Sequence, residues 1–325
     1  MKRNKSDLRI RQTWILFLKS DDGNRRRVFI IGYLTPNLLE LRKNVKKRPY
    51  MRIKVGLDIG GSTTKIVGMQ DGKMIASEIV RAADPVTSAF GAVGKLINDH
   101  SFSVNDIEQI NITGVGAGFP QAPILGIKTV VVEEFKATGL GGLFLTGLDH
   151  AIVVSMGTGT AYLEANKDSV RHIIGSGVCG GTLVGLGLAL TGTADAVKLS
   201  DMATSGDIVK CDLTIGDISK KVITGLPMNA TASNFGKAAE DLSREDKMAG
   251  VFNLVYQAVG TIAVMASRQF ELKDIVFTGQ LTDLKECQQY LLPFEDLYGV
   301  NMIVPENAVY ATALGSCLAE GQEEK

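Results

Sequence analysis

Residues 55–65 place an acid, glycines, hydroxyls and a lysine in an order that suits phosphate binding. The segment reads Val-Gly-Leu-Asp-Ile-Gly-Gly-Ser-Thr-Thr-Lys, so an apolar strand should end near Asp58. The two glycines let the backbone approach an anion, because no side chain intervenes. Ser62, Thr63 and Thr64 can then hold phosphate oxygens together with backbone N–H groups, and Asp58 can hold a hydrated Mg²⁺. The spacing is not that of a Walker A loop, and an ordinary glycine-rich turn is the alternative.

Further turns rich in glycine and hydroxyls follow later apolar segments. Gly157-Thr158-Gly159-Thr160 follows residues 151–156, and similar turns occupy residues 175–182 and 278–280. Two phosphate loops about one lobe apart resemble those of the actin, hexokinase and Hsp70 ATPase superfamily. The resemblance implies an α/β chain with a two-lobed actin-like (ribonuclease H-like) ATPase fold and a nucleotide cleft between the lobes.

Two adjacent acids, Glu133 and Glu134, stand between a short apolar run and a helical segment. In a kinase of this superfamily, a carboxylate there can accept the proton of the attacking hydroxyl. The alternative is that both acids stabilise a helix N-terminus through its dipole. The pattern alone leaves open which acid, if either, is the base.

The segments that must position these residues fall into two predicted lobes, 51–148 and 149–325. In the first lobe, Asp71-Gly72 has the composition of a type I′ hairpin turn. Strands are expected at 109–113 and 129–132, and helices at about 85–100 and from 135 onward. In the second lobe, helices are expected at 182–190, 245–269 and 308–320.

Residues 1–50 differ from the rest in charge. They carry 14 Lys and Arg against 4 Asp and Glu, whereas residues 51–325 carry 21 against 31. One interpretation is a basic arm for a membrane surface or nucleic acid. The favoured interpretation is a start codon assigned upstream of the natural one, because Met51 opens a normal first strand.

The remaining composition excludes several classes of function. The acidic balance of residues 51–325 argues against nucleic acid as a partner. No apolar run has the length of a membrane helix, and a signal peptide is not expected. Four scattered cysteines and three histidines form no metal-binding spacing and indicate reduced thiols in a cytoplasmic protein.

Several segments in order resemble the type II pantothenate kinases, over about residues 51–320. Besides the first loop, they are Glu134-Phe135-Lys136-Ala137, Gly157-Thr158-Gly159-Thr160, Gly180-Gly181-Thr182, Leu199-Ser200-Asp201-Met202-Ala203, Thr231-Ala232-Ser233-Asn234-Phe235-Gly236 and Pro305-Glu306-Asn307. The resemblance implies phosphorylation of pantothenate to 4'-phosphopantothenate, the first step of coenzyme A biosynthesis, with ATP and Mg²⁺.

The same resemblance assigns site residues. It makes Glu134 the general base and Glu133 its exposed neighbour, and it places Thr158 between nucleotide and pantothenate. Thr231 would face the substrate. The ATP phosphates would be wrapped by Gly60, Gly61, Ser62, Thr63, Thr64, Lys65, Ile66 and Val67, and the adenosine bounded by Gly180, Gly181, Thr182, Leu183, Val184 and Gln280.

The chain departs from the family pattern at some positions. Where the family has a substrate-binding arginine, His172 falls on the position and Arg171 one residue earlier. Ala196 replaces an aromatic near the nucleotide. The family's pocket can borrow an aromatic from a partner subunit, and Phe294 is the nearest match. A homodimer built by the second lobe is therefore expected, with the apolar segment 251–270 contributing; burial of this segment inside its own lobe is the alternative.

Two other functions of the same superfamily remain. An activator ATPase of 2-hydroxyacyl-CoA dehydratases has a similar first loop, but it needs paired interface cysteines for an iron–sulfur cluster. A sugar kinase with structural zinc is disfavoured because the chain lacks a Cys/His cluster.

Overall fold

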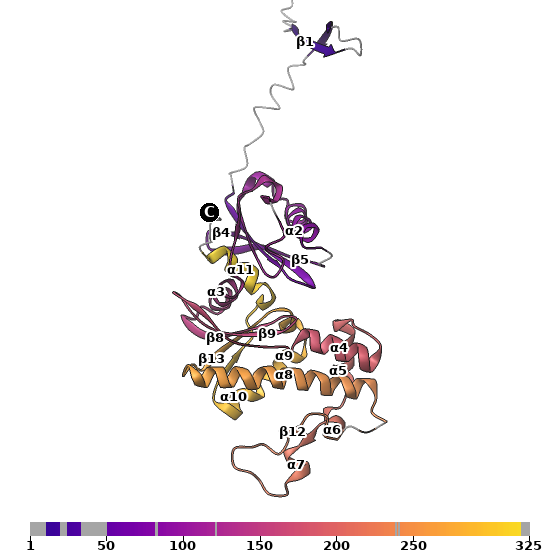
Figure 1. Cartoon of the computed structure of the whole chain (residues 1–325), viewed down its shortest axis with the longest axis vertical. Helices are drawn as coiled ribbons and strands as arrows, with labels where there is room; N and C mark the ends of the chain where they lie inside the picture. Colours follow the sequence, from indigo (N-terminus) through magenta and orange to yellow (C-terminus); the bar gives the residue numbers. More distant parts are fainter. Residues whose placement is uncertain are drawn as a thin grey trace, which may run out of the picture. The chain divides into compact units, whose positions relative to one another are not determined.

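Figure 1 shows the chain as a computed structural model, which describes residues 11–19, 25–33, 51–81, 84–120, 122–237, 239 and 241–319. Residues 1–50 and residues 51–325 form separate units. In the first unit, β1 (Arg11–Lys19) pairs antiparallel with β2 (Arg25–Tyr33). The proposal that residues 1–50 are not natively translated stays a prediction.

The first sheet of residues 51–325 has the spatial order β5-β4-β3-β6-β7. β3, β4 and β5 pair antiparallel, whereas β6 and β7 extend the sheet in parallel. Asp71 and Gly72 join β4 to β5 with φ of 50° and 72°, as the predicted type I′ turn requires. The strands are β3 (Ile53–Ile59), β4 (Thr63–Gln70), β5 (Lys73–Arg81), β6 (Ile107–Thr113) and β7 (Thr129–Val131).

The second sheet repeats this topology with the order β10-β9-β8-β13-β14. Its first three strands pair antiparallel, β13 pairs in parallel with β8, and β14 pairs in parallel with β13. The repetition confirms the predicted α/β class with two similar lobes. The strands are β8 (His150–Met156), β9 (Thr160–Asn166), β10 (Val170–Ser176), β13 (Asp274–Thr278) and β14 (Asn301–Ile303).

Successive side chains of a strand point to opposite faces of a sheet. In both sheets the two faces carry apolar side chains, and helices cover each face. In β4, Ile66 belongs to the core around α2, whereas its neighbour Val67 packs with α11. In β8, Val153 packs with α3 and Val154 with α8. The layers are thus α2, first sheet, α3 with α11, second sheet and α8 (Figure 1). These helices are α2 (Pro85–Asp99), α3 (Glu134–Thr146), α8 (Arg244–Gln269) and α11 (Ala311–Leu318).

Local signals explain where α2 begins. Asp84 is the N-cap, and its carboxylate accepts from the backbone N–H groups of Val86 and Thr87. Pro85 occupies the first helical position, where a missing N–H costs nothing. The helix predicted at 85–100 is confirmed, and α3, α8 and α11 likewise lie within or beside their predicted ranges.

α8 finds apolar neighbours inside its own lobe. Val251, Phe252, Val255 and Tyr256 are fully buried against the second sheet and the helices around it. The helix is long and apolar enough to cross a membrane, but 67% of its most apolar window is buried within the protein, as in a core helix. Burial in its own lobe therefore explains the composition of α8, which no longer argues for a dimer.

The remaining elements lie between and beside these layers. A subdomain of α6, β11, α7 and β12 projects from the second lobe (Figure 1). The four cysteines are free and buried. The bounds are η1 (Val104–Asp106), η2 (Ile124–Gly126), α4 (Gly180–Thr191), α5 (Ala196–Ser205), α6 (Ile208–Cys211), β11 (Leu213–Thr214), α7 (Ile215–Ile218), β12 (Thr231–Ser233), η3 (Gln280–Asp283), α9 (Glu286–Leu291), α10 (Pro293–Tyr298) and η4 (Ala308–Tyr310).

Candidate active site

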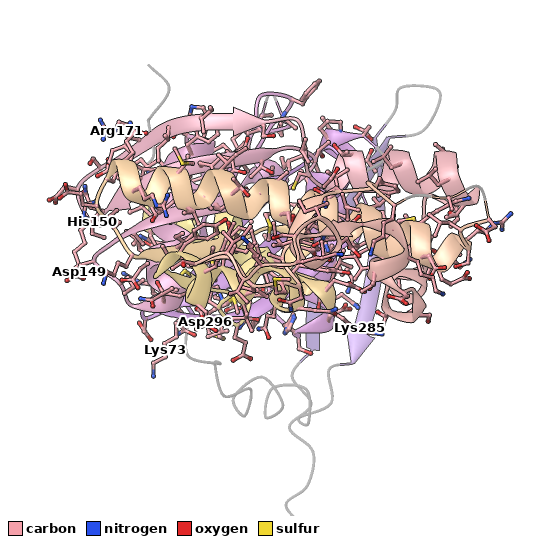
Figure 2. All side chains as sticks on the ribbon, turned by 90° about the horizontal axis from the view of Figure 1, so that it is seen from below. Lys73, Asp149, His150, Arg171, Lys285 and Asp296 are labelled. Atoms are coloured by element: carbon pink, nitrogen blue, oxygen red, sulfur yellow. The ribbon has the colours of Figure 1, made fainter. Side chains whose placement is uncertain are left out.

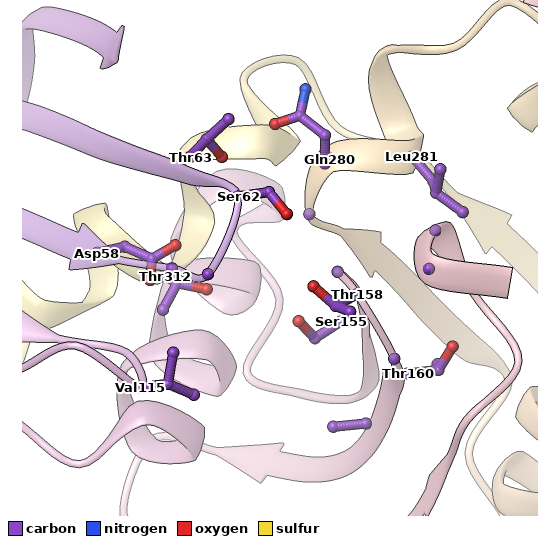
Figure 3. A pocket seen from close by; sticks show the side chains of 18 of the residues that line it. Asp58, Ser62, Thr63, Val115, Ser155, Thr158, Thr160, Gln280, Leu281 and Thr312 are labelled. Carbon is purple, nitrogen blue, oxygen red and sulfur yellow. The ribbon is translucent and has the colours of Figure 1, made fainter. Parts of the chain in front are cut away.

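A cavity of about 780 Å³ opens between the two lobes (Figure 3). The β3–β4 turn and the start of α3 line it from one lobe, and the β8–β9 turn, α4 and η3 line it from the other. The predicted residues that it brings together are Asp58, Gly60, Gly61, Ser62, Thr63, Lys65, Glu134, Thr158, Gly180, Gly181, Leu183, Val184, Ala196 and Gln280.

The β3–β4 turn is built around its two glycines. The Gly60 N–H donates to the Thr63 carbonyl over 3.1 Å, and a Cβ at Gly60 would lie 2.8 Å from that oxygen. A Cβ at Gly61 would meet nothing within 4 Å, so this backbone faces open space. The turn thus presents backbone together with the Ser62 and Thr63 hydroxyls to the cavity (Figure 3).

Three residues assigned to this loop lie outside the cavity lining. Thr64, Ile66 and Val67 are fully buried. Ile66 and Val67 belong to the cores on the two faces of the sheet. The assignment of these residues to the phosphates is therefore corrected: helices cover both faces of the sheet, so the β4 side chains on either face lie in the protein interior.

The second loop is joined to the start of α4 by backbone hydrogen bonds. The N–H groups of Gly180 and Gly181 donate to the carbonyls of Gly157 and Thr158 over 3.1 and 2.8 Å. A Cβ at Gly180 would lie 2.7 Å from the Gly157 oxygen, which explains the glycine there. The Thr158 side chain lines the cavity (Figure 3).

Thr182 has a local role instead. Its hydroxyl donates to the Gly177 carbonyl over 2.8 Å and accepts from the Cys179 N–H over 3.4 Å. It lies outside the cavity lining, so the predicted contact of its side chain with ATP is corrected to a cap of the turn before α4.

The η3 segment closes the second lobe's side of the cavity. Gly279 has φ of 93°, and a Cβ there would lie 2.6 Å from the Met156 carbonyl oxygen, so only glycine fits. The next residue, Gln280, lines the cavity, and its Oε1 is buried without a partner among the described residues. An acceptor in this state is suited to a donor group on a ligand.

Asp58 and Lys65 form an ion pair on the floor of the cavity, with Nζ 3.4 Å from Oδ2. Burial raises the pKa of Asp58, and the neighbouring Lys65 ammonium opposes that rise. Thr113 lies beside Asp58 in the sheet, and its buried hydroxyl has no partner among the described residues. A Cβ at Gly114 would lie 2.6 Å from Asp58 Oδ1, so the carboxylate is tightly confined.

These surroundings fit a hydrated Mg²⁺ held by one protein carboxylate. No group of three or more His, Cys, Asp or Glu side chains suited to a metal occurs in the part of the chain that the structure describes. Mg²⁺ is commonly bound through one or two carboxylates, with waters and substrate phosphates completing its shell. Asp58, beside the first phosphate loop, meets that requirement.

The two adjacent acids have different surroundings. Glu133 is exposed and caps α3, because its carboxylate accepts from the Phe135 and Lys136 N–H groups over 3.0 and 2.6 Å. Glu134 is partly buried and lines the cavity. Burial raises the pKa of Glu134 most, and the charges of Asp58 and Glu133 add to the rise. Only Glu134 therefore combines access to the cavity with the properties of a general base.

Arg171 and His172 both lie outside the cavity lining. Arg171 is exposed at the surface (Figure 2), where its guanidinium pairs with Glu164 over 3.0 Å and lies 4.5 Å from the centre of the Phe270 ring. His172 stacks on Phe135, with ring centres 4.6 Å apart. Phe135 is the residue that follows Glu134 in the chain. Of the two candidates, His172 is thus the one beside the start of α3.

Thr231 lies in a second cavity, of about 850 Å³, which shares no lining residue with the first. Its hydroxyl accepts from Asn253 Nδ2 over 3.1 Å. The same amide nitrogen donates to the buried carboxylate of Asp212 over 2.6 Å. Phe294 lines this cavity too. Thr231 thus lies outside the first cavity, and its contact with substrate stays a prediction.

Some residues of the cleft were not predicted. Val115, Ser155 and Thr312 line the first cavity (Figure 3). Ser155 is close to the second loop in sequence, so its strand offered a signal. Thr312 is at the start of α11, and no local pattern connects that helix with loops more than 150 residues away.

Comparisons with known proteins identify relatives of this chain. A family model described as Fumble matches residues 150–295. The type II pantothenate kinase of Staphylococcus aureus strain MRSA252 is 30% identical over 275 residues, which cover 81% of this chain and 98% of that kinase. The one from strain USA300 is 29% identical over 279 residues, 82% of this chain and 100% of that kinase.

The chain belongs to the type II pantothenate kinase family.

Solved structures similar to this family member show the fold alone, because their sequence identities are low. Component A of the (R)-2-hydroxyglutaryl-CoA dehydratase of Acidaminococcus fermentans has a TM-score of 0.60 at 18% identity, covering 82% of this chain and 96% of its own. A ROK glucokinase of Streptomyces griseus, with glucose and AMPPNP, has a TM-score of 0.53 at 14% identity, covering 82% and 98%. Both support the predicted two-lobed fold.

Proposed function

We propose that this chain transfers the γ-phosphoryl group of ATP to the primary hydroxyl of pantothenate and forms 4'-phosphopantothenate, at the start of coenzyme A biosynthesis. The observation that carries the proposal is the position of Glu134: a partly buried carboxylate with a raised pKa in a cavity that two glycine- and hydroxyl-rich turns also line. This is the arrangement that transfer to a hydroxyl needs.

ATP lies across both lobes in this proposal. Backbone and hydroxyls from Gly60 to Thr63, together with Thr158, hold the phosphates, and Lys65 offsets their charge. The apolar side chains of Leu183, Val184, Ala196 and Leu281 enclose the nucleoside at the other end of the cavity. Mg²⁺, bound to the phosphates and near Asp58, would neutralise the charge that develops on the phosphate oxygens.

Glu134 acts on the acceptor. It takes the proton of the pantothenate hydroxyl while the hydroxyl oxygen forms a bond to the γ-phosphorus. The bond between that phosphorus and the β,γ-bridging oxygen breaks, ADP leaves, and the proton passes from Glu134 to solvent. The raised pKa suits this role, because a base with a pKa nearer neutrality accepts a proton more readily.

The substrate contacts are proposed to come from two subunits. His172, stacked on Phe135 near the start of α3, is the candidate contact from the same chain. Thr231 lines the second cavity and would reach substrate in the cleft of a partner, whereas Phe294, at 7% exposure, packs in the core of its own lobe. The apolar side chains exposed beside this cavity, including Val222 at 82% and Ile223 at 40%, support a covered face in a homodimer.

The activator type of ATPase is disfavoured despite its similar fold. The activator of the 2-hydroxyisocaproyl-CoA dehydratase of Clostridium difficile, solved with ADPNP, has a TM-score of 0.59 at 17% identity. A cluster between subunits needs accessible thiolates. In this chain Cys179, Cys211, Cys287 and Cys317 are all buried.

The cellular setting is also part of this proposal. Residues 51–325 carry a net excess of acids, which disfavours nucleic acid as a partner. α8 is a core helix of the second lobe. We place the protein in the cytoplasm, without a membrane partner.

A kinase assay tests the proposal. Labelled ATP and Mg²⁺ are incubated with the protein and with pantothenate, pantetheine, glucose or N-acetylglucosamine in separate reactions. We expect pantothenate to be phosphorylated with the highest kcat/KM. Label transfer to a sugar and none to pantothenate would contradict the proposal, and a preference for pantetheine would change the acceptor but keep the chemistry.

A further inference from the structure

Glu286 is a buried acid that the proposed phosphoryl transfer does not use. It is 1% exposed and is the first residue of α9. Its carboxylate accepts from Ser200 Oγ over 2.9 and 2.8 Å and lies 2.8 Å from Thr204 Oγ1, whose single proton is shared with the Ser200 carbonyl oxygen at 2.9 Å. Both hydroxyls belong to α5, so the carboxylate joins two helices that are far apart in sequence.

The two joined segments form opposite walls of the apolar end of the cleft. α5 begins at Ala196, which lines the cavity, and Leu199 packs so closely on α4 that a Cβ at Gly187 would lie 2.4 Å from its Cδ1. On the other side, η3 provides Gln280 and Leu281 to the cavity and continues into α9. Glu286 therefore connects the α4–α5 wall with the η3–α9 wall.

The connection is stronger than a surface ion pair between the same helices. Lys285, next to Glu286, pairs with Asp201 of α5 over 3.2 Å at the surface (Figure 2), with side chains 71% and 61% exposed. Exposed pairs contribute little, because solvent and salt screen them. A buried carboxylate depends on its hydrogen-bond donors, since it has no water to replace them.

We propose that Glu286 is a positioning residue that holds the two walls at the separation required by the nucleoside part of ATP. The inference rests on the proposed function, because it takes this end of the cleft as the nucleoside site. It makes a distinction that the proposed function does not make: loss of the Glu286 contacts should weaken nucleotide binding and leave the pantothenate contacts unchanged.

The test compares Glu286→Leu, Glu286→Gln and the matched surface variant Lys285→Met in the full chain. Calorimetry gives the Kd of ADPNP, and steady-state kinetics give KM for ATP and for pantothenate. For Glu286→Leu we expect Kd and KM for nucleotide to rise about tenfold, the upper part of the range for residues that act without touching ligand. KM for pantothenate should change less than about twofold, Glu286→Gln should restore most of the affinity, and Lys285→Met should match the parent.

Ser200→Ala is the second variant if Glu286→Leu does not fold, because it removes a donor and keeps the volume of the site. A lowered melting temperature with unchanged nucleotide Kd would overturn the inference and leave a purely structural role. An equal rise of KM for both substrates would overturn it too. A parent protein that binds no ADPNP would overturn the proposed function itself, so the two failures are distinguishable.

Discussion

At the scale of residues, Glu133 and Glu134 show how neighbouring acids acquire different chemistry from their surroundings. Glu133 is exposed and uses both oxygens to cap α3. Glu134 lies in the cleft, where burial and the nearby charge of Asp58 raise its pKa. A carboxylate with a raised pKa reduces the stability of the fold when it is ionised, so a base at this position has a measurable cost.

We expect Glu134→Gln to stabilise the fold at neutral pH. The folded-state pKa of Glu134 exceeds its unfolded value, so the folded state binds the proton more tightly, and the stability of the wild type falls as pH rises between these two pKa values. The neutral amide avoids that loss. Thermal melts from pH 4 to pH 8 should show that the melting temperature of the variant exceeds that of the wild type by an amount that grows with pH and then levels off. An advantage that is largest at low pH would contradict ionisation of Glu134 as its cause.

Asp58→Asn should weaken the response to Mg²⁺ more than it weakens nucleotide binding. A carboxylate binds hard cations, directly or through water, better than an amide does. The Mg²⁺ concentration for half-maximal activity should rise about tenfold, equivalent to ~1.4 kcal/mol. The Kd of ADPNP without Mg²⁺ serves as the control and should stay within about threefold. An equal loss of nucleotide affinity with and without Mg²⁺ would argue against a metal role for Asp58.

At the scale of elements, α3 and α11 form the contact between the two lobes that positions Glu134. A Cβ at Gly315 would lie 1.8 Å from the Ala137 carbonyl oxygen, and one at Gly141 would lie 1.8 Å from that of Ala311. Thr138 and Thr312 are hydrogen-bonded across the same crossing, with 2.9 Å between their hydroxyl oxygens. Glu134 starts α3, so the spacing of these helices sets its position in the cleft.

Gly315→Ala should therefore destabilise the protein and reduce kcat. Overpacking typically costs ~1–3 kcal/mol, and backbone contacts leave little room to relax. Gly94→Ala in α2 is the matched control, because a Cβ there meets nothing within 4 Å. The free energy of unfolding of the control should rise by ~0.5–1 kcal/mol, because alanine has a better helix propensity than glycine. Denaturant unfolding measures the stability of both variants. A Gly315→Ala variant as stable as the parent would contradict the close packing.

Elements encoded by local signals were predicted from the sequence, and those set by distant contacts were not. Asp71-Gly72 defines its hairpin by turn chemistry, and Asp84-Pro85 defines the start of α2. The return of α11 to the first sheet has no local signal, because it is decided by packing against β3 and α3. Composition also could not show that Thr182 caps a turn, or that α8 is buried within its own lobe.

At the scale of the whole molecule, residues 51–325 form a unit distinct from residues 1–50. A variant that begins at Met51 should melt within about 2 °C of the full chain, roughly the shift that ~1 kcal/mol causes at this size. Its kcat and KM should be unchanged. A large loss of either stability or activity would show that the first fifty residues support the kinase fold.

The proposed homodimer predicts that sites can be restored by mixing subunits. Glu134→Gln removes a residue that a chain uses in its own cleft, whereas Thr231→Val removes one that it supplies to its partner. Mixed dimers would contain one intact site, so random exchange should restore about one quarter of wild-type activity in an isologous dimer. Glu134→Gln mixed with Asp58→Asn is the control and should restore no activity beyond that of the Asp58→Asn dimers alone. Light scattering that finds only active monomers would refute the shared site.

Phosphoryl transfer should depend on Glu134, the acid that α3 brings into the cleft between the lobes. The decisive measurement is the rate of 4'-phosphopantothenate formation by Glu134→Gln and by Glu133→Gln at saturating ATP and pantothenate, with ADPNP affinity as the test of an intact cleft. Loss of a general base costs ~10²–10⁴-fold, so Glu134→Gln should fall by that factor and retain ADPNP binding, while Glu133→Gln keeps most of its activity. Normal turnover by Glu134→Gln would contradict the mechanism.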